Sequence, residues 1–295
     1  MCVTCGCANE NQVILINPQT GETIELETST DQTHSHSHSL PDGRLLTHTH
    51  GALNSDSAVD NSPTIPPEIH AKIHAEVHGR TITLEQEILA KNNSAAAQNR
   101  RWFREQNILA LNLVSSPGAG KTTLLTRTIN DLKSQISFSV IEGDQATDHD
   151  AEKIRATGCN TVQINTGTGC HLEATMIAWG YRQLNPPSNS IVMIENVGNL
   201  VCPALFDLGE QGKVAILSVT EGEDKPIKYP HLFRASQVMI LTKIDLLPYL
   251  NFDLDQCLEY AYGVNPQMKI FQVSALTGAG LNDWYDWLNH QLING

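Results

Sequence analysis

Short runs of mostly apolar residues recur after residue 107 of this 295-residue chain. Continuously apolar runs of this length are typical of strands that are buried on both faces of a sheet. Helical patterns separate most of them, and strands that alternate with helices form parallel sheets with right-handed crossovers. We therefore predict an α/β fold with a mostly parallel sheet flanked by helices. The predicted strands are Ile108–Val114, Phe138–Ile141, Thr161–Ile164, Ile191–Ile194, Val214–Val219, Val238–Leu241 and Ile270–Val273.

The stretch SSPGAGKTT, residues 115–123, follows the first predicted strand and leads into a helical pattern. A glycine-rich loop in this context is typical of a phosphate-binding P-loop, because its backbone N–H groups face phosphate oxygens at the positive end of the helix. We expect Lys121 to reach the β- and γ-phosphates and the Thr122 hydroxyl to coordinate Mg²⁺. The residues predicted to bind the phosphates are Gly118, Ala119, Gly120, Lys121, Thr122 and Thr123.

Two further segments predict which base the nucleotide carries. Thr242-Lys243-Ile244-Asp245 ends a predicted strand and resembles the N/T-K-x-D element of GTPases. The Asp245 carboxylate would accept hydrogen bonds from the ring N–H and the exocyclic amine of guanine, whereas adenine offers no matching pair of donors. Residues 274–276 follow the last predicted strand and resemble the S-A-x element that closes over guanine. The chain is thus expected to bind GTP, through Thr242, Lys243, Asp245, Ser274, Ala275 and Leu276.

Acidic residues near the ends of two predicted strands are candidates for catalysis. Glu195 and Gly198 lie where GTPases carry D-x-x-G, which suggests a place near Mg²⁺ for the carboxylate and a γ-phosphate contact for the glycine backbone. The alternative is an ordinary turn at the end of a strand. Asp144 and Asp150 lie in the expected switch region, each a candidate for coordinating Mg²⁺ or for orienting water. The predicted catalytic residues are Lys121, Asp144, Asp150 and Glu195.

Cys170, His171 and Cys202 form a second set of chemically notable residues in the same region. An adjacent Cys-His pair at a helix start, together with a distant cysteine, offers sulfur and nitrogen ligands for Zn²⁺ or Ni²⁺. A buried cysteine with a purely structural role is nevertheless the commoner case. Spacing leaves both interpretations open. Cys159 and Cys257 have no neighbouring ligand in the sequence, and we expect them to be core or surface residues.

Cys2, Cys5 and Cys7 all lie within the first seven residues. This segment has neither the basic n-region nor the apolar h-region of a signal peptide, and no apolar run in the chain is long enough to span a membrane. We therefore expect a cytoplasmic protein whose thiols stay reduced and bind a soft metal ion. The formal net charge of −13 argues against nucleic acid as a partner.

The composition divides the chain into an arm and a folded domain. Ser, Thr, His, Asp, Asn and Pro dominate residues 29–67, and such a composition cannot bury a core. Val13–Ile16 and Thr23–Leu26 are expected to form a small hairpin. The predicted order is a largely disordered Cys/His-bearing metal-binding arm over residues 1–80, a helix over 81–106 that begins at a capping box at Thr83, and a GTPase domain over 107–295.

Histidines are concentrated in the predicted arm. They suggest auxiliary buffering of nickel or zinc, but a solvated polar linker and a helix face that happens to be rich in histidine would look the same. The histidines before residue 80 are His34, His36, His38, His48, His50, His70, His74 and His78.

Taken together, these motifs resemble the hydrogenase nickel-incorporation GTPases, the HypB family of SIMIBI-class P-loop GTPases. The resemblance covers the first seven residues and nearly all of 80–295. It departs from common patterns at Ser115, which replaces the first P-loop glycine, and at Thr242, which replaces an asparagine. The segments that carry it are C-x-x-C-G-C at Cys2, Cys5 and Cys7, SPGAGKT at 116–122, GCHL at 169–172, ENVGNLVCP at 195–203 and TEGEDKP at 220–226.

The resemblance implies a nucleotide-promoted homodimer that hydrolyses GTP and helps to deliver nickel to the [NiFe]-hydrogenase large subunit. The implied partners are that subunit and a HypA-like nickel metallochaperone. A tight Ni²⁺ site is implied at Cys2, Cys5 and Cys7, and a weaker site for Ni²⁺ or Zn²⁺ at Cys170, His171 and Cys202. Because Cys202 follows Gly198 closely, a switch that moves on hydrolysis would move a metal ligand. The alternative function is nickel storage with a vestigial GTPase.

An apolar segment directly after Asp245 has two interpretations. Leu246, Leu247, Tyr249 and Leu250 surround Pro248. They would either pack against the C-terminal helix beside Trp284 and Trp287 or form a contact between two copies of the chain.

Overall fold

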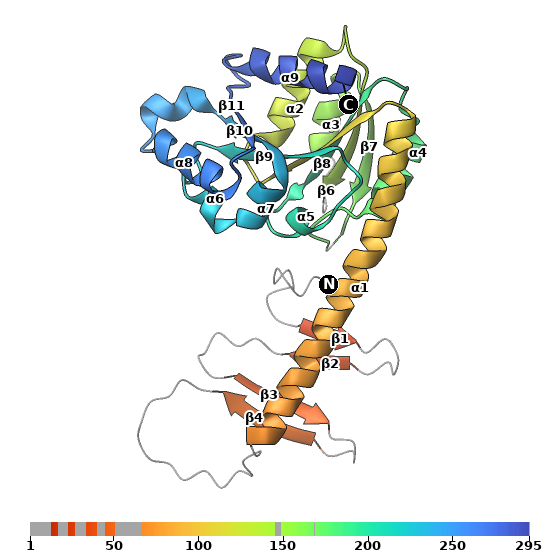
Figure 1. The fold of residues 1–295 in the computed structure, drawn as a ribbon, viewed down its shortest axis with the longest axis vertical. Coiled ribbons are helices and arrows are strands. Elements are labelled where there is room, and N and C mark those ends of the chain that lie inside the picture. Colours follow the sequence, from red (N-terminus) through yellow and green to blue (C-terminus); the bar gives the residue numbers. More distant parts are fainter. Residues whose placement is uncertain are drawn as a thin grey trace. The chain divides into compact units, whose positions relative to one another are not determined.

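The computed structural model describes residues 13–16, 23–26, 34–39, 45–50, 67–144, 149–167 and 169–294. Side chains are described from residue 86 onward, apart from residues 145–148, 168 and the last two. The chain divides into two compact units near Arg80, and each is described by itself (Figure 1). Cys2, Cys5 and Cys7 lie outside the described residues, so their metal site stays a prediction.

The described residues of the first unit include two antiparallel strand pairs. β1 (Val13–Ile16) pairs with β2 (Thr23–Leu26), at the residues where the sequence predicts a hairpin. β3 (His34–Ser39) pairs with β4 (Leu45–His50) in a register that places His34 opposite His50. The second pair was not predicted, because β3 alternates His and Ser, and β4 has apolar residues only at Leu45 and Leu46, so neither shows the apolar pattern from which strands are recognised.

Helix α1 runs from Pro67 to Glu105 and therefore begins well before Thr83, where the sequence pattern places its start. Proline is favoured at the first position of a helix, since its missing N–H has no partner there in any case. The capping-box pattern at Thr83 lies inside the helix and does not start it. Near its C-terminal end, Trp102 stacks on Tyr181 of α4 (Ala174–Leu184), with ring centroids 4.0 Å apart.

A seven-stranded sheet forms the centre of the second unit, and every neighbouring pair of its strands is parallel. The order across the sheet is β11-β10-β9-β5-β8-β6-β7, so β5 is central. All seven predicted strands are present, and the predicted fold class is confirmed. The strands are β5 (Leu109–Ser115), β6 (Phe138–Asp144), β7 (Asn160–Asn165), β8 (Ile191–Gly198), β9 (Gly212–Ser218), β10 (Ser236–Thr242) and β11 (Lys269–Gln272).

Helices cover both faces of this sheet (Figure 1). None of the described helices is long and apolar enough to cross a membrane. Besides α1 and α4, they are α2 (Lys121–Leu132), α3 (His149–Arg155), α5 (Cys202–Leu205), α6 (Lys225–Lys228), α7 (Pro230–Ala235), the 3₁₀ helix η1 (Ile244–Tyr249), α8 (Leu254–Val264) and α9 (Leu281–Asn294).

Three apolar clusters fill the space between helices and sheet. The first packs α2, α3 and α9 against one face, and Leu111 and Leu113 of β5 point into it. The other two lie on the opposite face, one around α7 and α8 and one around α1 and α4. Because side chains alternate along a strand, Ala110 and Val114 of β5 belong to these two clusters. β5 is buried throughout, and the P-loop follows directly after its carboxyl end.

The segment around η1 does not pack against the C-terminal helix, which was one of its two interpretations. Leu246 and Leu247 are partly buried against the cluster of α7 and α8, whereas Trp284 and Trp287 of α9 belong to the cluster on the opposite face. Packing beside these tryptophans is therefore wrong. Tyr249 is 82% exposed, so part of the segment stays open to contact.

Gly280 lies in the turn between residues 274–276 and α9. Its φ is +71°, and a Cβ atom there would lie 1.9 Å from the carbonyl oxygen of Gln272 on β11. An alanine would thus combine left-handed backbone strain with an overlap that β11 cannot relieve without moving.

We predict that Gly280→Ala lowers the free energy of unfolding by about 2 kcal/mol more than Gly158→Ala does. Gly158 has a similar φ of +85° but open space around its Cβ position, so it isolates the backbone term. Urea unfolding followed by tryptophan fluorescence measures both. Equal losses would show that the Gln272 contact relaxes freely.

Candidate functional site

The P-loop connects β5 to α2 and has the geometry of an anion site. Gly118 and Gly120 have φ values of +76° and +91°, in a region of backbone conformation that residues with a side chain rarely adopt. Gly120 is the N-cap of α2 and supplies no capping side chain, so the first N–H groups of the helix remain available to a ligand. Ser115, at the position of the usual first glycine, is buried, and its hydroxyl donates to the Ser116 carbonyl at 2.7 Å.

Lys121 and Thr122 both contact one carboxylate of β8, Glu195. The Thr122 hydroxyl donates to Glu195 Oε1 at 2.7 Å, and Lys121 Nζ lies 3.2 Å from the same oxygen. Glu195 is 1% exposed. Gly198, at the end of β8, packs so closely on the loop that a Cβ atom would lie 2.8 Å from Pro117 Cγ. The residues that the sequence assigns to Mg²⁺ and to the γ-phosphate thus lie against the P-loop.

A second buried carboxylate lies beside Glu195 and was not singled out from the sequence. Glu142 on β6 is opposite Glu195 in the β6–β8 register and is 3% exposed. Burial raises its pKa to about 8, and the charges of Glu195, Asp144 and Asp150 add to the rise. A signal existed, because Glu142 and Asp144 are two residues apart on one strand and therefore share a face.

This group of oxygens fits a magnesium ion. Glu142 Oε2 and Glu195 Oε2 are buried and have no hydrogen-bond partner among the described residues. Carboxylate and hydroxyl oxygens are the donors that a hard divalent cation prefers. A cation next to Thr122 would satisfy atoms that burial otherwise leaves at a cost.

The two switch candidates lie near this acidic group. Asp144 ends β6, and its carbonyl accepts from the Thr166 backbone N–H at 2.9 Å. Asp150 lies in the first turn of α3 and pairs with Lys153 at 2.9 Å. Both charges act on Glu142. Residues 145–148 between them lie outside the described part, so the choice between Mg²⁺ ligand and water-orienting residue stays open.

The segment that the sequence predicts to recognise the base contacts the P-loop backbone. The Thr242 hydroxyl donates to the Ala119 carbonyl at 2.6 Å, and Lys243 Nζ donates to the Gly118 carbonyl at 2.7 Å. Lys243 adopts a left-handed backbone with φ of +60° as the N-cap of η1, and Asp245 lies in the first turn of this helix. Thr242 therefore acts on the loop backbone, which explains why a short hydroxyl side chain suits this position.

The S-A-x segment lies next to the Asp245 segment because β11 neighbours β10. The Ile244 N–H donates to the Val273 carbonyl at 3.3 Å, which joins the two loops. Arg127 on α2 donates to the Ala275 carbonyl at 3.0 Å, whereas the Leu276 side chain is 81% exposed. Ser274 is buried, and its hydroxyl accepts from the Thr277 N–H.

Cys170, His171 and Cys202, here called the triad, come together in space. The two sulfurs are 3.1 Å apart, and Cys170 Sγ lies 3.6 Å from His171 Nδ1. One ligand atom from each residue lies within 4.8 Å of the others. The sulfur–sulfur distance exceeds that of a disulfide, about 2.05 Å, so no disulfide joins these two thiols. Two thiols and an imidazole form a donor set suited to Zn²⁺ or Ni²⁺.

The surroundings of the triad favour a neutral imidazole. Burial lowers the pKa of His171, while Glu173 opposes the shift. The ring packs on Phe206 with centroids 3.9 Å apart, and its Nε2 has no partner among the described residues. A neutral, partly desolvated histidine is ready to bind a cation. By contrast, burial raises the pKa of Cys159 to about 11 and that of Cys257 to about 12, which suits structural thiols.

The segment after Glu195 links the triad to the P-loop. Asn196 accepts from the Leu172 N–H at 3.2 Å, and Asn199 donates to the Cys170 carbonyl at 3.3 Å. The sequence motif contains both asparagines, but nothing in the spacing assigned them a role. Eight residues, 195–202, thus run from the acidic group to Cys202.

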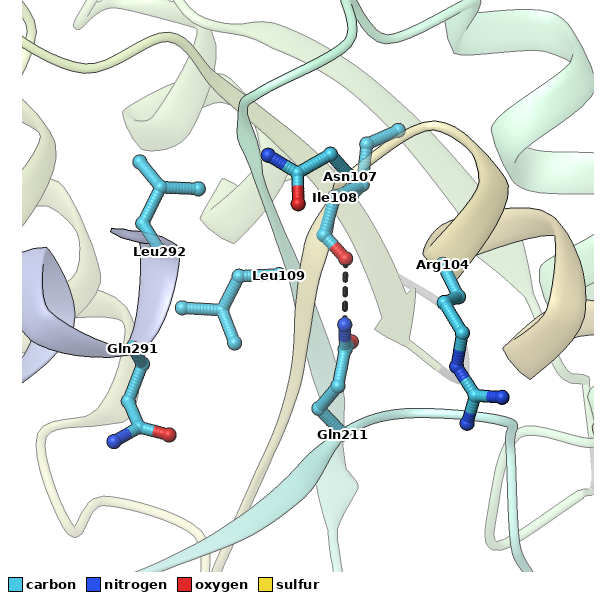
Figure 2. Close-up of a pocket in the computed structure, with 7 residues that line it drawn as sticks. All are labelled: Arg104, Asn107, Ile108, Leu109, Gln211, Gln291 and Leu292. Atoms are coloured by element: carbon cyan, nitrogen blue, oxygen red, sulfur yellow. Dashed lines mark hydrogen bonds between the residues drawn. The ribbon is translucent and has the colours of Figure 1, made fainter. Parts of the chain in front are cut away.

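A small pocket at the other end of β5 shows none of these features. Figure 2 shows Gln211 pointing toward the Ile108 carbonyl, to which it donates at 2.8 Å. The lining contains no thiol, imidazole or carboxylate, so this pocket does not compete with the P-loop as the candidate site. Its residues are Arg104, Asn107, Ile108, Leu109, Gln211, Gln291 and Leu292.

Comparison with known proteins shows which family the chain resembles. Residues 109–272 match the family model of the CobW/HypB/UreG nucleotide-binding domain. The crystal structure of HypB from Archaeoglobus fulgidus aligns with a TM-score of 0.65 at 36% identity, over 69% of this chain and 100% of that one. HypB from Helicobacter pylori in complex with nickel aligns with a TM-score of 0.64 at 36% identity, over 68% and 95%.

Curated relatives extend the likeness over almost the whole chain. The hydrogenase maturation factor HypB of Cupriavidus necator is 42% identical over 98% of this chain and 88% of its own length. That of Escherichia coli K12 is 56% identical over 72% of this chain and 73% of its own. With its P-loop, its parallel sheet and these similarities, the chain belongs to the HypB family of hydrogenase maturation factors, which are P-loop GTPases.

Proposed function

We propose that this chain is a GTP-hydrolysing nickel metallochaperone, which binds Ni²⁺ and aids its delivery to the [NiFe]-hydrogenase large subunit during maturation. The observation that carries the proposal is the path of the chain from Glu195 to Cys202. Glu195 contacts the P-loop, and the Cys202 sulfur is 3.1 Å from that of Cys170. A thiol–imidazole site is thereby attached to a nucleotide site. The nickel complex of the H. pylori relative supports the choice of metal.

The hydrolytic step rests on the acidic group beside the P-loop. When GTP binds, the Lys121 amine leaves its ion pair with Glu195 and contacts phosphate oxygens instead. The N–H groups of the loop also bind the phosphates. The oxygens of Thr122, Glu195 and Glu142 would then hold Mg²⁺, which neutralises charge on the β- and γ-phosphates when bound. Asp144 and Asp150 are each proposed either to coordinate Mg²⁺ or to orient the attacking water, and the products are GDP and phosphate.

The metal cargo has two proposed sites. Cys2, Cys5 and Cys7 supply thiolates for a Ni²⁺ loading site, and the triad supplies a second site for Ni²⁺, with Zn²⁺ as the competing ion. Thiolate ligands must lose a proton, so affinity at both sites falls as the pH is lowered. Hydrolysis would shift the 195–202 segment and so change the geometry of the triad.

The working form is proposed to be a nucleotide-promoted homodimer. Tyr249 is 82% and Leu250 38% exposed, directly after Asp245, so a surface that contacts a second copy would adjoin the bound base. The proposed partners are a HypA-like nickel metallochaperone, which works beside this chain, and the hydrogenase large subunit, which receives the metal.

Nickel stoichiometry tests the proposal. Cys170→Ala should bind one equivalent of nickel fewer than wild type, and the combined Cys2→Ala, Cys5→Ala and Cys7→Ala variant should lose its tightest equivalent. Cys159→Ala is the matched control, because this thiol has no imidazole beside it, and it should bind as wild type does. Equilibrium dialysis with metal analysis measures the stoichiometry, and phosphate release measures GTP hydrolysis. Multiple equivalents without hydrolysis would instead favour a nickel storage protein.

Guanine recognition tests the nucleotide assignment separately. Asp245→Asn should weaken GTP binding by about a hundredfold, since two hydrogen bonds to a carboxylate are lost. It should also improve binding of xanthosine triphosphate, whose base offers a carbonyl where guanine has its amine. Asp255→Asn, in the exposed first turn of α8, is the control. Unchanged GTP affinity in Asp245→Asn would contradict the assignment.

A further inference from the structure

Two buried asparagines on α1 lie outside every motif considered so far. Asn92 is 6% and Asn99 1% exposed. They are seven residues apart and therefore lie on one face of the helix, with Ala96 and Phe103, which are also buried. Amides on a face that otherwise packs against a core carry a desolvation cost, so their hydrogen bonds indicate what the positions do.

Both asparagines bind the first residue of α4. The Ala174 N–H donates to Asn92 Oδ1 at 2.9 Å, and the Ala174 carbonyl accepts from Asn99 Nδ2 at 2.7 Å. α4 itself has no side-chain cap at its N-terminus. Asn92 therefore acts as a cap supplied from another helix, and Ala174 is held at both of its backbone groups.

The same two amides also bind the segment that follows α5. Asn92 Nδ2 donates to the Asp207 carbonyl at 2.7 Å, and Asn99 Nδ2 donates to the Leu208 carbonyl at 2.9 Å. Arg100 adds a two-pronged ion pair to the Asp207 carboxylate, at 2.6 and 2.8 Å. Asn99 Oδ1 is buried without a partner among the described residues, so this side chain serves through its donors.

These two segments are the ones that carry the triad. Ala174 follows His171 by three residues, and Asp207 follows Cys202 by five. Phe206, the residue before Asp207, packs on the His171 ring and so joins the two segments. Each asparagine thus bridges the Cys170–His171 side of the site and the Cys202 side, while touching no ligand atom itself.

We propose that Asn92 and Asn99 are positioning residues for the triad, which fix the separation of its two ligand-bearing segments so that both sulfurs and the imidazole meet one metal ion. This inference rests on the proposed role of the triad as a nickel site. Polar groups outside the ligand shell that orient ligands typically contribute 10–100-fold to metal affinity. A spacing set by short hydrogen bonds is also stiffer than one set by apolar packing.

The test uses the full-length chain with Cys2, Cys5 and Cys7 changed to alanine, so that the triad is the site under study, with Ni²⁺ as the probe. Asn92→Ala and Asn99→Ala should each weaken nickel binding by about tenfold or more. They should also shift the thiolate-to-nickel charge-transfer absorption at saturation, whereas GTP affinity stays within twofold. Asn93→Ala, an exposed asparagine on the same helix, is the matched control and should change neither.

A milder variant tests the positioning role if an asparagine variant does not fold. Arg100→Gln removes the ion pair to Asp207, a partly exposed contact, and leaves the core intact. It should shift the absorption band and weaken nickel binding by a few fold. Wild-type affinity and spectrum in Arg100→Gln would then overturn the inference.

Cys170→Ala in the same background separates this inference from the proposed function. If Cys170→Ala abolishes binding while Asn92→Ala and Asn99→Ala behave like Asn93→Ala, the positioning role is wrong and the triad stands. If Cys170→Ala binds nickel as tightly as the background does, the triad is not the nickel site and both fail.

Discussion

The convergence of Lys121 and Thr122 on Glu195 organises the candidate site. This carboxylate lies within β8, next to the central strand β5, so whatever it contacts is fixed relative to the sheet. Residues that follow Glu195 in the chain contact the triad and the residue next to it. Asn196 accepts a hydrogen bond from the Leu172 N–H, and the Cys202 sulfur contacts that of Cys170. We therefore expect that a phosphate and a cation that replaced these contacts would displace the start of this short segment.

A polar path across the sheet strengthens the same connection. Asn196 donates to Asn112 of β5, Asn112 donates to Glu210, and Glu210 pairs with buried Lys213 at 2.8 Å. Lys213 in turn donates to the carbonyl of Phe206, the residue that packs on His171. Buried and satisfied networks of this kind set geometry more strictly than apolar contacts do. Both this network and the two asparagines of α1 thus bind the segments that carry the triad.

The sequence predicted the sheet well because strands buried on both faces leave an unambiguous apolar pattern, as β5 and β8 do. It also predicted which residues gather, since the carboxyl ends of parallel strands meet at one edge. Glu142 was missed because a carboxylate in an otherwise apolar strand carries no motif. Asn92 and Asn99 were missed because their partners are backbone groups some eighty to over a hundred residues away. β3 contains no apolar residue and β4 only Leu45 and Leu46, so this pair had no strand pattern. The early turns of α1 did carry a helical signal, since Ile69, Ile73 and Val77 are four residues apart, but the prediction followed the capping-box pattern at Thr83 instead.

The central claim is that the nucleotide state sets the metal affinity of the triad. The most direct test measures nickel affinity in the Cys2→Ala, Cys5→Ala, Cys7→Ala background with GDP and with a non-hydrolysable GTP analogue. Coupling through residues 195–202 predicts a difference of at least about fivefold, the lower end of ordinary coupling between sites. Lys121→Ala, which removes the phosphate-binding amine, should abolish that difference. Identical affinities in the two nucleotide states of the unmodified P-loop would contradict the account.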